Sequence, residues 1–244
     1  MRIARICLSL LEAETMLFVH PDFDHQINLP GAGLCSRPVD IDRTHTGFSE
    51  LVSLRIYLFA EGVVIDGQAE EDEVFIVLLR GRADVTVLVD GPPSDSFQLQ
   101  RGGGSRAIYM PPHSSYQLSA ISECDIAYAR AMPTGEKMPP VLGFTPSADR
   151  LDIIGHALGM ELMLATVAAG RHSASFNATP SPERFIHVRS DGAVTATIGG
   201  EAMGNWDSVA LSAGESALLT VHTGTVDVLT ICATRCDRVH QRPQ

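Results

Sequence analysis

Short apolar runs rich in β-branched residues recur along the chain, and Gly, Pro or Asp residues separate most of them. The clearest run is 83–89, where Val85, Val87 and Val89 stand at alternate positions and therefore share one face of an extended segment. Runs of strand length with turn residues between them are typical of sandwiches and barrels. The pattern predicts an all-β fold.

The predicted strands form two groups with a proline-rich segment between them. The first group comprises Leu51–Phe59, Val74–Leu79, Ala83–Val89, Ala107–Met110, Ser115–Ala120 and Asp125–Arg130. The second comprises Glu161–Ala168, Phe185–Val188, Ala193–Ile198, Ser208–Leu211, Ser216–Val221 and Val226–Cys232. Residues 132–149, between the groups, contain four of the 14 prolines. Because proline cannot donate a ladder hydrogen bond, this segment is predicted to be a linker.

The two groups also resemble each other in sequence. Glu73-Val-Phe-Ile aligns with Glu183-Arg-Phe-Ile, and Gly104 aligns with Gly214 at the same offset of 110 residues. An internal duplication explains this register together with the length of the chain. The predicted organisation is an N-terminal extension (1–16), a first barrel (17–131), a linker (132–149), a second barrel (150–234) and a tail (235–244).

Composition narrows the class of protein. Hydrophobic residues make up 45% of the 244 residues and charged residues 19%. Disordered chains are instead poor in hydrophobic residues and rich in charged ones, so this composition indicates a folded protein. The net charge of −11 argues against a nucleic-acid-binding protein, which needs a basic surface. No apolar run approaches the roughly 18 residues of a membrane span. We expect neither nucleic acid nor membrane as a partner.

The N-terminus and the cysteines favour a cytoplasmic location. Arg2 and Arg5 precede a short apolar stretch, but Glu12 and Glu14 follow it without a small-residue cleavage site. The five cysteines are odd in number and loosely spaced, unlike a disulfide framework. We therefore expect free thiols.

Several stretches together resemble a known family. They read Thr46-Gly-Phe, Ser53-Leu-Arg-Ile-Tyr-Leu-Phe, Glu73-Val-Phe-Ile-Val-Leu-Leu-Arg-Gly and Ala107-Ile-Tyr-Met-Pro-Pro-His. With the internal repeat, the chain resembles the bicupins of the 5-deoxy-glucuronate isomerase family of inositol catabolism, over about Leu17 to Thr234. The resemblance implies two tandem cupin (jelly-roll) β-barrels. His113 departs from the family pattern because it replaces the glycine expected after Pro-Pro.

The resemblance also implies a divalent metal in the second barrel. Such a metal would polarise a sugar carbonyl while a base moves a proton between neighbouring carbons. The implied ligands are a His-x-His-type pair, a Glu and a later His. Residues 173–182 contain no histidine where the pair should lie, and His222 lies up to three residues from the expected position of the last ligand. Only Glu183 stands where the family's Glu would be, so the metal site is predicted to be degenerate.

The candidate site residues all belong to the second barrel. The catalytic candidates, which are also the only candidate metal ligands, are Glu183, His172 and His222; the candidate binding residues are Arg184, His187, Arg189 and Asn177. Glu183 would act as ligand or base, and an arginine would pair with a substrate carboxylate. Two alternatives remain open: Glu183 as an ordinary strand-end charge, and His187 as a barrel-wall residue on the face shared with Phe185 and Arg189.

Two functional hypotheses follow. The first is a family member with a decayed metal site that now binds a small molecule, such as a sugar acid or another carboxylate, or acts as an interaction protein. A barrel stabilised by apolar burial can outlive its chemistry. The second is an active aldose–ketose isomerase of a uronate-like sugar acid with its site at the mouth of the second barrel. The edge strands of such barrels also suit a homodimer.

Overall fold

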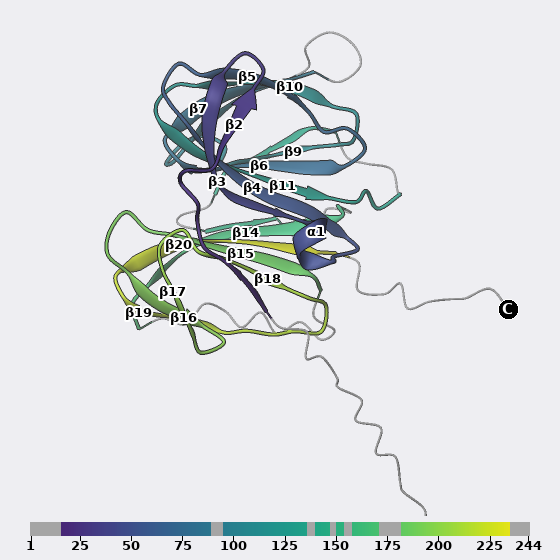
Figure 1. The fold of residues 1–244 in the computed structure, drawn as a ribbon. Coiled ribbons are helices and arrows are strands. Elements are labelled where there is room, and N and C mark those ends of the chain that lie inside the picture. Colours follow the sequence, from purple (N-terminus) through teal and green to yellow (C-terminus); the bar gives the residue numbers. More distant parts are fainter. Residues whose placement is uncertain are drawn as a thin grey trace, which may run out of the picture.

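The protein folds into two β-rich units that stack on each other (Figure 1). The computed structural model describes residues 16–88, 95–135, 140–146, 150–153, 158–170 and 182–234. The all-β prediction is confirmed, because the only helix among these residues is the four-residue α1 (Arg43–Thr46). Nothing helical in these ranges has the length and hydrophobicity needed to cross a bilayer. The predicted tail and all but Met16 of the predicted extension lie outside the described residues.

The first unit packs a large sheet against a smaller one. The large sheet contains, in spatial order, β12 (Leu142–Phe144), β9 (Ala107–Met110), β6 (Glu73–Arg80), β11 (Cys124–Ala131), β4 (Leu51–Phe59), β3 (Gly33–Asp42) and β2 (Gln26–Leu29). The small sheet contains β5 (Val64–Gln68), β10 (Ser115–Ala120), β7 (Arg82–Leu88) and β8 (Asp95–Gln100). All strand pairs are antiparallel, as in a jelly roll.

The second unit repeats this plan with fewer strands. Its large sheet contains, in spatial order, β1 (Leu17–Val19), β18 (Ser208–Leu211), β15 (Arg184–Arg189), β20 (Thr225–Ala233), β14 (Met160–Ala168) and β13 (Arg150–Ile153). Its small sheet contains β17 (Glu201–Met203), β16 (Thr195–Ile198) and β19 (Leu219–Thr223). Tandem jelly rolls are therefore the fold, as predicted.

The topology supports the internal duplication. In the first large sheet β9, β6, β11 and β4 are neighbours in that order, and in the second β18, β15, β20 and β14 follow the same order. The two glutamates aligned in sequence also occupy equivalent places, since Glu73 begins β6 and Glu183 directly precedes β15.

Two short strands lie outside the predicted boundaries. The predicted first barrel began at residue 17, but Phe18 of β1 pairs with Val209 of β18 in the second unit. The predicted linker contains β12, in which Gly143 pairs with Ile108 of β9 in the first unit. β12 adds to the edge of the first large sheet at β9, and β1 adds to the edge of the second at β18. Without them, unpaired backbone groups of β9 and β18 would face solvent. Three-residue strands give too weak a periodic pattern to be recognised in the sequence.

The largest hydrophobic cluster lies between the units rather than inside either one. The two large sheets face each other across it (Figure 1). Ile56 and Phe75 contribute from the first unit, and Phe185, Leu229 and Ile231 from the second; each is at most 1% exposed. Burying a side chain of this size stabilises the fold by about 1.5–3 kcal/mol. The interface is therefore a principal source of stability.

Two buried glutamates complete this interface from opposite sides. Glu183 accepts hydrogen bonds from the backbone N–H groups of Ser49 (2.5 Å), Glu50 (2.9 Å) and Leu51 (2.9 Å), and from the Ser49 hydroxyl (2.9 Å). Its equivalent, Glu73, accepts from the N–H of Gly159 at 2.6 Å. In each case a carboxylate from one unit satisfies backbone donors of the other, so these residues form a reciprocal clamp.

We expect Glu183→Gln to lower the free energy of unfolding by about 2–4 kcal/mol. The substitution removes the charge from several charge-assisted hydrogen bonds and turns an amide N–H₂ toward backbone donors. Urea denaturation checks this, with Glu201→Gln on the exposed β17 as the matched control. Equal midpoints for the two variants would contradict a stabilising role for the Glu183 carboxylate.

Candidate functional site

The candidates around β15 are buried in the interface and in the wall of the second unit. Phe185, His187 and Arg189 point to one side of the strand, as the alternation predicted, while Ile186 and Val188 belong to the interior cluster of the second jelly roll. By the alternation of side chains along the strand, Arg184 lies on the same side as Ile186 and Val188, and it is 2% exposed. The structure thus brings neighbouring candidates to opposite faces rather than into one site.

Glu183 lines none of the three cavities found among the described residues, and both of its carboxylate oxygens accept hydrogen bonds from residues 49–51. The sequence left open whether Glu183 is a site carboxylate or an ordinary strand-end charge. The contacts are those of a structural group that joins the two units. Its catalytic role stays a prediction that these contacts do not favour.

His187 is a fully buried imidazole. Its Nδ1 lies 2.9 Å from the Ser208 hydroxyl, and its ring meets the edge of Trp206 with centroids 5.7 Å apart. Burial, with a smaller contribution from the nearby Arg189 charge, lowers the pKa of His187 to about 3. The ring is therefore neutral at physiological pH and packs as a wall residue, which was the alternative reading of this position.

Arg189 is an interdomain ion-pair residue. Its Nε lies 2.8 Å from the buried Asp125 of β11, and its Nη1 lies 2.6 Å from Asp191. Asp125 also pairs with Arg80 at 3.0 Å. Arg189 therefore connects the two units through a buried ion pair.

The remaining candidates do not join this group. His222 is exposed on β19, where its Nε2 lies 3.1 Å from the Thr197 hydroxyl. His172 and Asn177 lie outside the described residues. The catalytic set expected in the second barrel is therefore not assembled by the residues that can be placed.

The described residues also do not fit the metal that the resemblance implies. Glu183 accepts hydrogen bonds, His187 is buried against Trp206, and His222 is exposed on the small sheet. Within the described ranges, no group of three or more His, Cys, Asp or Glu side chains could hold a metal ion. We derive no chemistry through a metal here.

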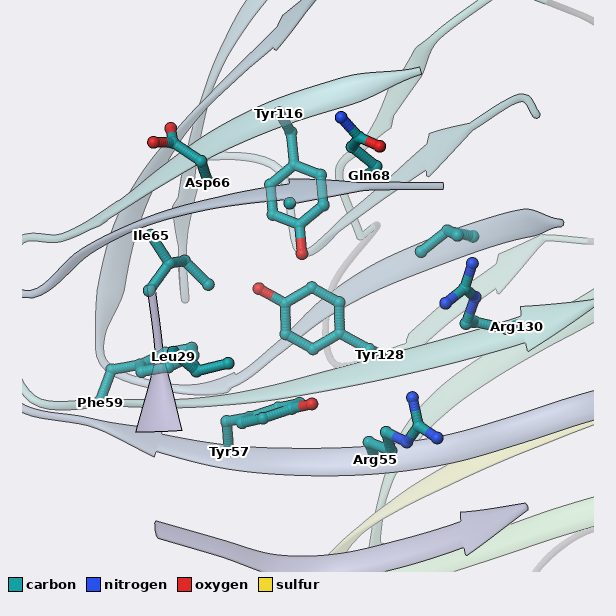
Figure 2. Close-up of a pocket in the computed structure, with 12 residues that line it drawn as sticks. Leu29, Arg55, Tyr57, Phe59, Ile65, Asp66, Gln68, Tyr116, Tyr128 and Arg130 are labelled. Atoms are coloured by element: carbon teal, nitrogen blue, oxygen red, sulfur yellow. The ribbon is translucent and has the colours of Figure 1, made fainter. Parts of the chain in front are cut away.

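A pocket opens instead inside the first jelly roll. Its volume is about 180 Å³, and Figure 2 shows the lining side chains. Leu29, Phe59 and Ile65 form an apolar end, whereas the guanidinium groups of Arg55 and Arg130 lie together at the opposite end (Figure 2). The pocket therefore has an apolar body and a cationic end.

Three tyrosines line the middle of this pocket. The hydroxyls of Tyr116 and Tyr128 face each other, and the ring of Tyr57 lies beneath Tyr128 (Figure 2). Tyr57 and Tyr128 meet edge to face at 5.3 Å. Burial raises the pKa of Tyr116 to about 12 and that of Tyr128 well above its usual value. Both hydroxyls are thus protonated and can donate hydrogen bonds at neutral pH.

Acidic neighbours hold the two arginines in place. The Nε of Arg55 donates to Asp40 at 3.0 Å. Arg130 pairs with Glu70 and with Asp72, at 3.0 Å each, and donates to the Ala69 carbonyl. Ion pairs of this kind fix the long side chains and leave part of each guanidinium edge for a ligand.

The sequence carries a pattern that marks this site. Arg55 and Tyr57 stand at alternate positions of β4, and Tyr128 and Arg130 do so on β11. The strands are neighbours, and Tyr128 pairs with Arg55. Paired Arg-x-Tyr and Tyr-x-Arg patterns in otherwise apolar strands could have marked one polar face.

We expect His187→Gln to flatten the dependence of stability on acid pH. The unfolded imidazole binds a proton below about pH 6.5, whereas the folded one does so only near pH 3, so the free energy of unfolding falls as pH drops through this window. The contribution is up to about 1.4 kcal/mol per pH unit. Urea denaturation at several pH values measures it, and His222→Gln is the exposed control. A slope identical to the wild type would contradict the assignment.

Comparison with solved structures identifies the fold. An IolB-like protein from Salmonella typhimurium is 17% identical, with a TM-score of 0.61 over 81% of this chain and 88% of that chain. The bacterial pirin YhhW from Escherichia coli, solved with nickel(II), is 14% identical, with a TM-score of 0.65 over 90% and 99% of the two chains. The oxalate decarboxylase of Lactobacillus farciminis, solved with formate, is 10% identical, with a TM-score of 0.62 over 89% and 86%.

No curated protein sequence matches this chain. The model of the KduI/IolB family, however, matches residues 33–156, which span most of the first jelly roll and reach β13 of the second unit. This match agrees with the resemblance to 5-deoxy-glucuronate isomerases and with the tandem jelly rolls. The chain is a bicupin that belongs to the KduI/IolB family.

Proposed function

We propose that this protein is a small-molecule-binding member of the KduI/IolB family, and that the pocket of the first jelly roll binds a monocyclic carboxylic acid. One observation carries the proposal: two guanidinium groups and three tyrosine rings converge on one cavity inside a barrel. Concave sites with apolar walls and a few convergent polar groups are the usual form of ligand sites.

The size of the pocket limits the ligand. A cavity of about 180 Å³ is smaller than the roughly 300–1,000 Å³ of sites for drug-sized molecules. It is close to the roughly 150 Å³ cavity that accommodates a single benzene ring. A six-membered ring with one small substituent therefore fits, whereas a disaccharide or a nucleotide does not.

The charge distribution selects the substituent. The terminal nitrogens of Arg55 form no hydrogen bond to any residue that the structure describes, and its guanidinium lines the pocket beside Arg130. Asp66, the carboxylate of the lining, is held by the side chain of Gln117 at 3.0 Å and points away from the arginines (Figure 2). A ligand carboxylate can accept from the guanidiniums while its ring lies among the tyrosines.

Isomerisation of a uronate is the competing function, and it is the one that the family resemblance implies. It would need a carbonyl-polarising group and a base beside the sugar. The described residues of the second unit do not bring such groups together, and in the first pocket the carboxylate of Asp66 accepts from Gln117 and points away from the arginines (Figure 2). Binding without turnover is therefore the better-supported activity.

We expect Arg55→Gln to weaken carboxylate binding by about 10- to 100-fold, the effect of losing charge-assisted hydrogen bonds. Isothermal titration calorimetry with benzoate, cyclohexanecarboxylate and glucuronate measures this. Arg82→Gln, at an exposed arginine of β7 remote from the pocket, is the matched control. Failure of the wild type to bind any of the three acids, or conversion of glucuronate to a ketose, would overturn the proposal.

Gly67→Ala offers an independent test of the location. Gly67 and Tyr116 both line the pocket, and a Cβ at position 67 would lie 2.3 Å from the ring of Tyr116, so the added methyl group takes up space at the lining and the ring must shift. We expect the smaller cavity to lose most of its affinity for a ring acid while the fold persists. Titration of this variant, with circular dichroism as the control for folding, checks the point. Unchanged affinity would place the ligand elsewhere.

A further inference from the structure

A second cavity lies at the junction of the two jelly rolls. Its volume is about 140 Å³. Arg101 and Arg106 line it from the first unit, and Thr166 and Asp227 line it from β14 and β20 of the second. Neither the family resemblance nor the pocket proposed above assigns a role to these residues.

Arg106 is the unusual member of this group. It is only 6% exposed, and its Nε donates to the Leu78 carbonyl at 3.1 Å. Its two terminal nitrogens form no hydrogen bond to any residue within the described ranges. Burial lowers the pKa of Arg106, and the charge of Asp227 only partly opposes that effect. The terminal nitrogens of this largely buried guanidinium are open to the cavity, so a group that completes their hydrogen bonds would be bound favourably.

The loop beside Arg106 supplies further donors. Gly102 and Gly103 line the same cavity and have positive φ angles of 81° and 137°, which suit glycine. The structure shows no acceptor among its described residues for either backbone N–H. Free backbone N–H groups in such turns form anion-binding concavities. The sequence Arg101-Gly-Gly-Gly is no P-loop, but it can still present these donors to an anion.

The charges around the cavity leave one cation uncompensated. Asp227 accepts from Thr166 at 2.6 Å and pairs with Arg101 at 3.2 Å. One carboxylate therefore faces two guanidiniums, and Arg101 is the exposed one that can turn toward a ligand. The adjoining cleft is different, because its Arg189 already pairs with Asp125 and Asp191.

We propose that this cavity binds a small oxyanion, with Arg106 and the N–H groups of Gly102 and Gly103 as its principal donors. The donors belong to the first unit, and Leu151, Leu164 and Thr166 close the cavity from the second, so the cavity exists only when the two jelly rolls are assembled. An anion bound there would therefore stabilise the native arrangement, with the logarithm of its concentration once that concentration exceeds the dissociation constant. This site is separate from the ring-acid pocket and does not depend on it.

Calorimetric titration of the full chain with inorganic phosphate tests the proposal, with chloride used to hold the ionic strength constant. We expect saturable binding of about one phosphate per chain at millimolar concentrations, with an affinity loss of about tenfold or more in Arg106→Gln. Arg101→Gln, which changes an exposed residue, should weaken binding even if Arg106→Gln folds poorly. Arg82→Gln should bind phosphate as the wild type does.

Acetate provides the second arm of the titration. Binding of acetate that depends on Arg106 would support the site and assign it to carboxylates rather than phosphates. Absence of saturable binding of both anions, or equal binding by wild type and the Arg101 and Arg106 variants, would overturn the proposal. Arg55→Gln separates the two sites, since it should leave phosphate binding unchanged whatever it does to benzoate binding.

Discussion

The structure depends on the burial of two large sheets against each other. Each of these sheets is largely buried on both faces, because one face fills its own jelly roll and the other contacts the opposite unit. Carboxylates at the interface can be tolerated only where they accept hydrogen bonds, and Glu73 and Glu183 do so from backbone donors of the other unit. The duplication has thus produced one cooperative core rather than two independent barrels.

This constraint also decides where chemistry can be found. The outer face of β15 presents His187 and Arg189 to the interface. There His187 packs against Trp206, and Arg189 pairs with Asp125. Residue types that suggest a catalytic site are used here for packing and ion pairing. The first unit keeps a cavity in its interior, with Arg55 and Arg130 among the residues that line it.

Much of the fold could be predicted from the sequence, and little of the site. The strands Leu51–Phe59, Ala107–Met110, Ser115–Ala120 and Ser208–Leu211 were predicted with the bounds that the structure shows. Long apolar runs are recognisable because burial on both faces demands them. β3 was not predicted because Pro38 interrupts its apolar pattern. β5 was not predicted because Asp66 and Gly67 weaken the strand pattern of that segment. Partners in space, such as Ser49 for Glu183, leave no trace in the local sequence.

The position of β1 has a consequence for the order of folding. Phe18 lies near the start of the chain, yet its ladder partner is Val209. During synthesis the first jelly roll can form before β18 has been made. Until β18 leaves the ribosome, β1 has no ladder partner. Contacts so distant in sequence are slow to form, and the waiting segment is an unpaired edge open to other chains. The last step of assembly would then be the return of the N-terminal strand, which joins the beginning of the chain to its final sheet.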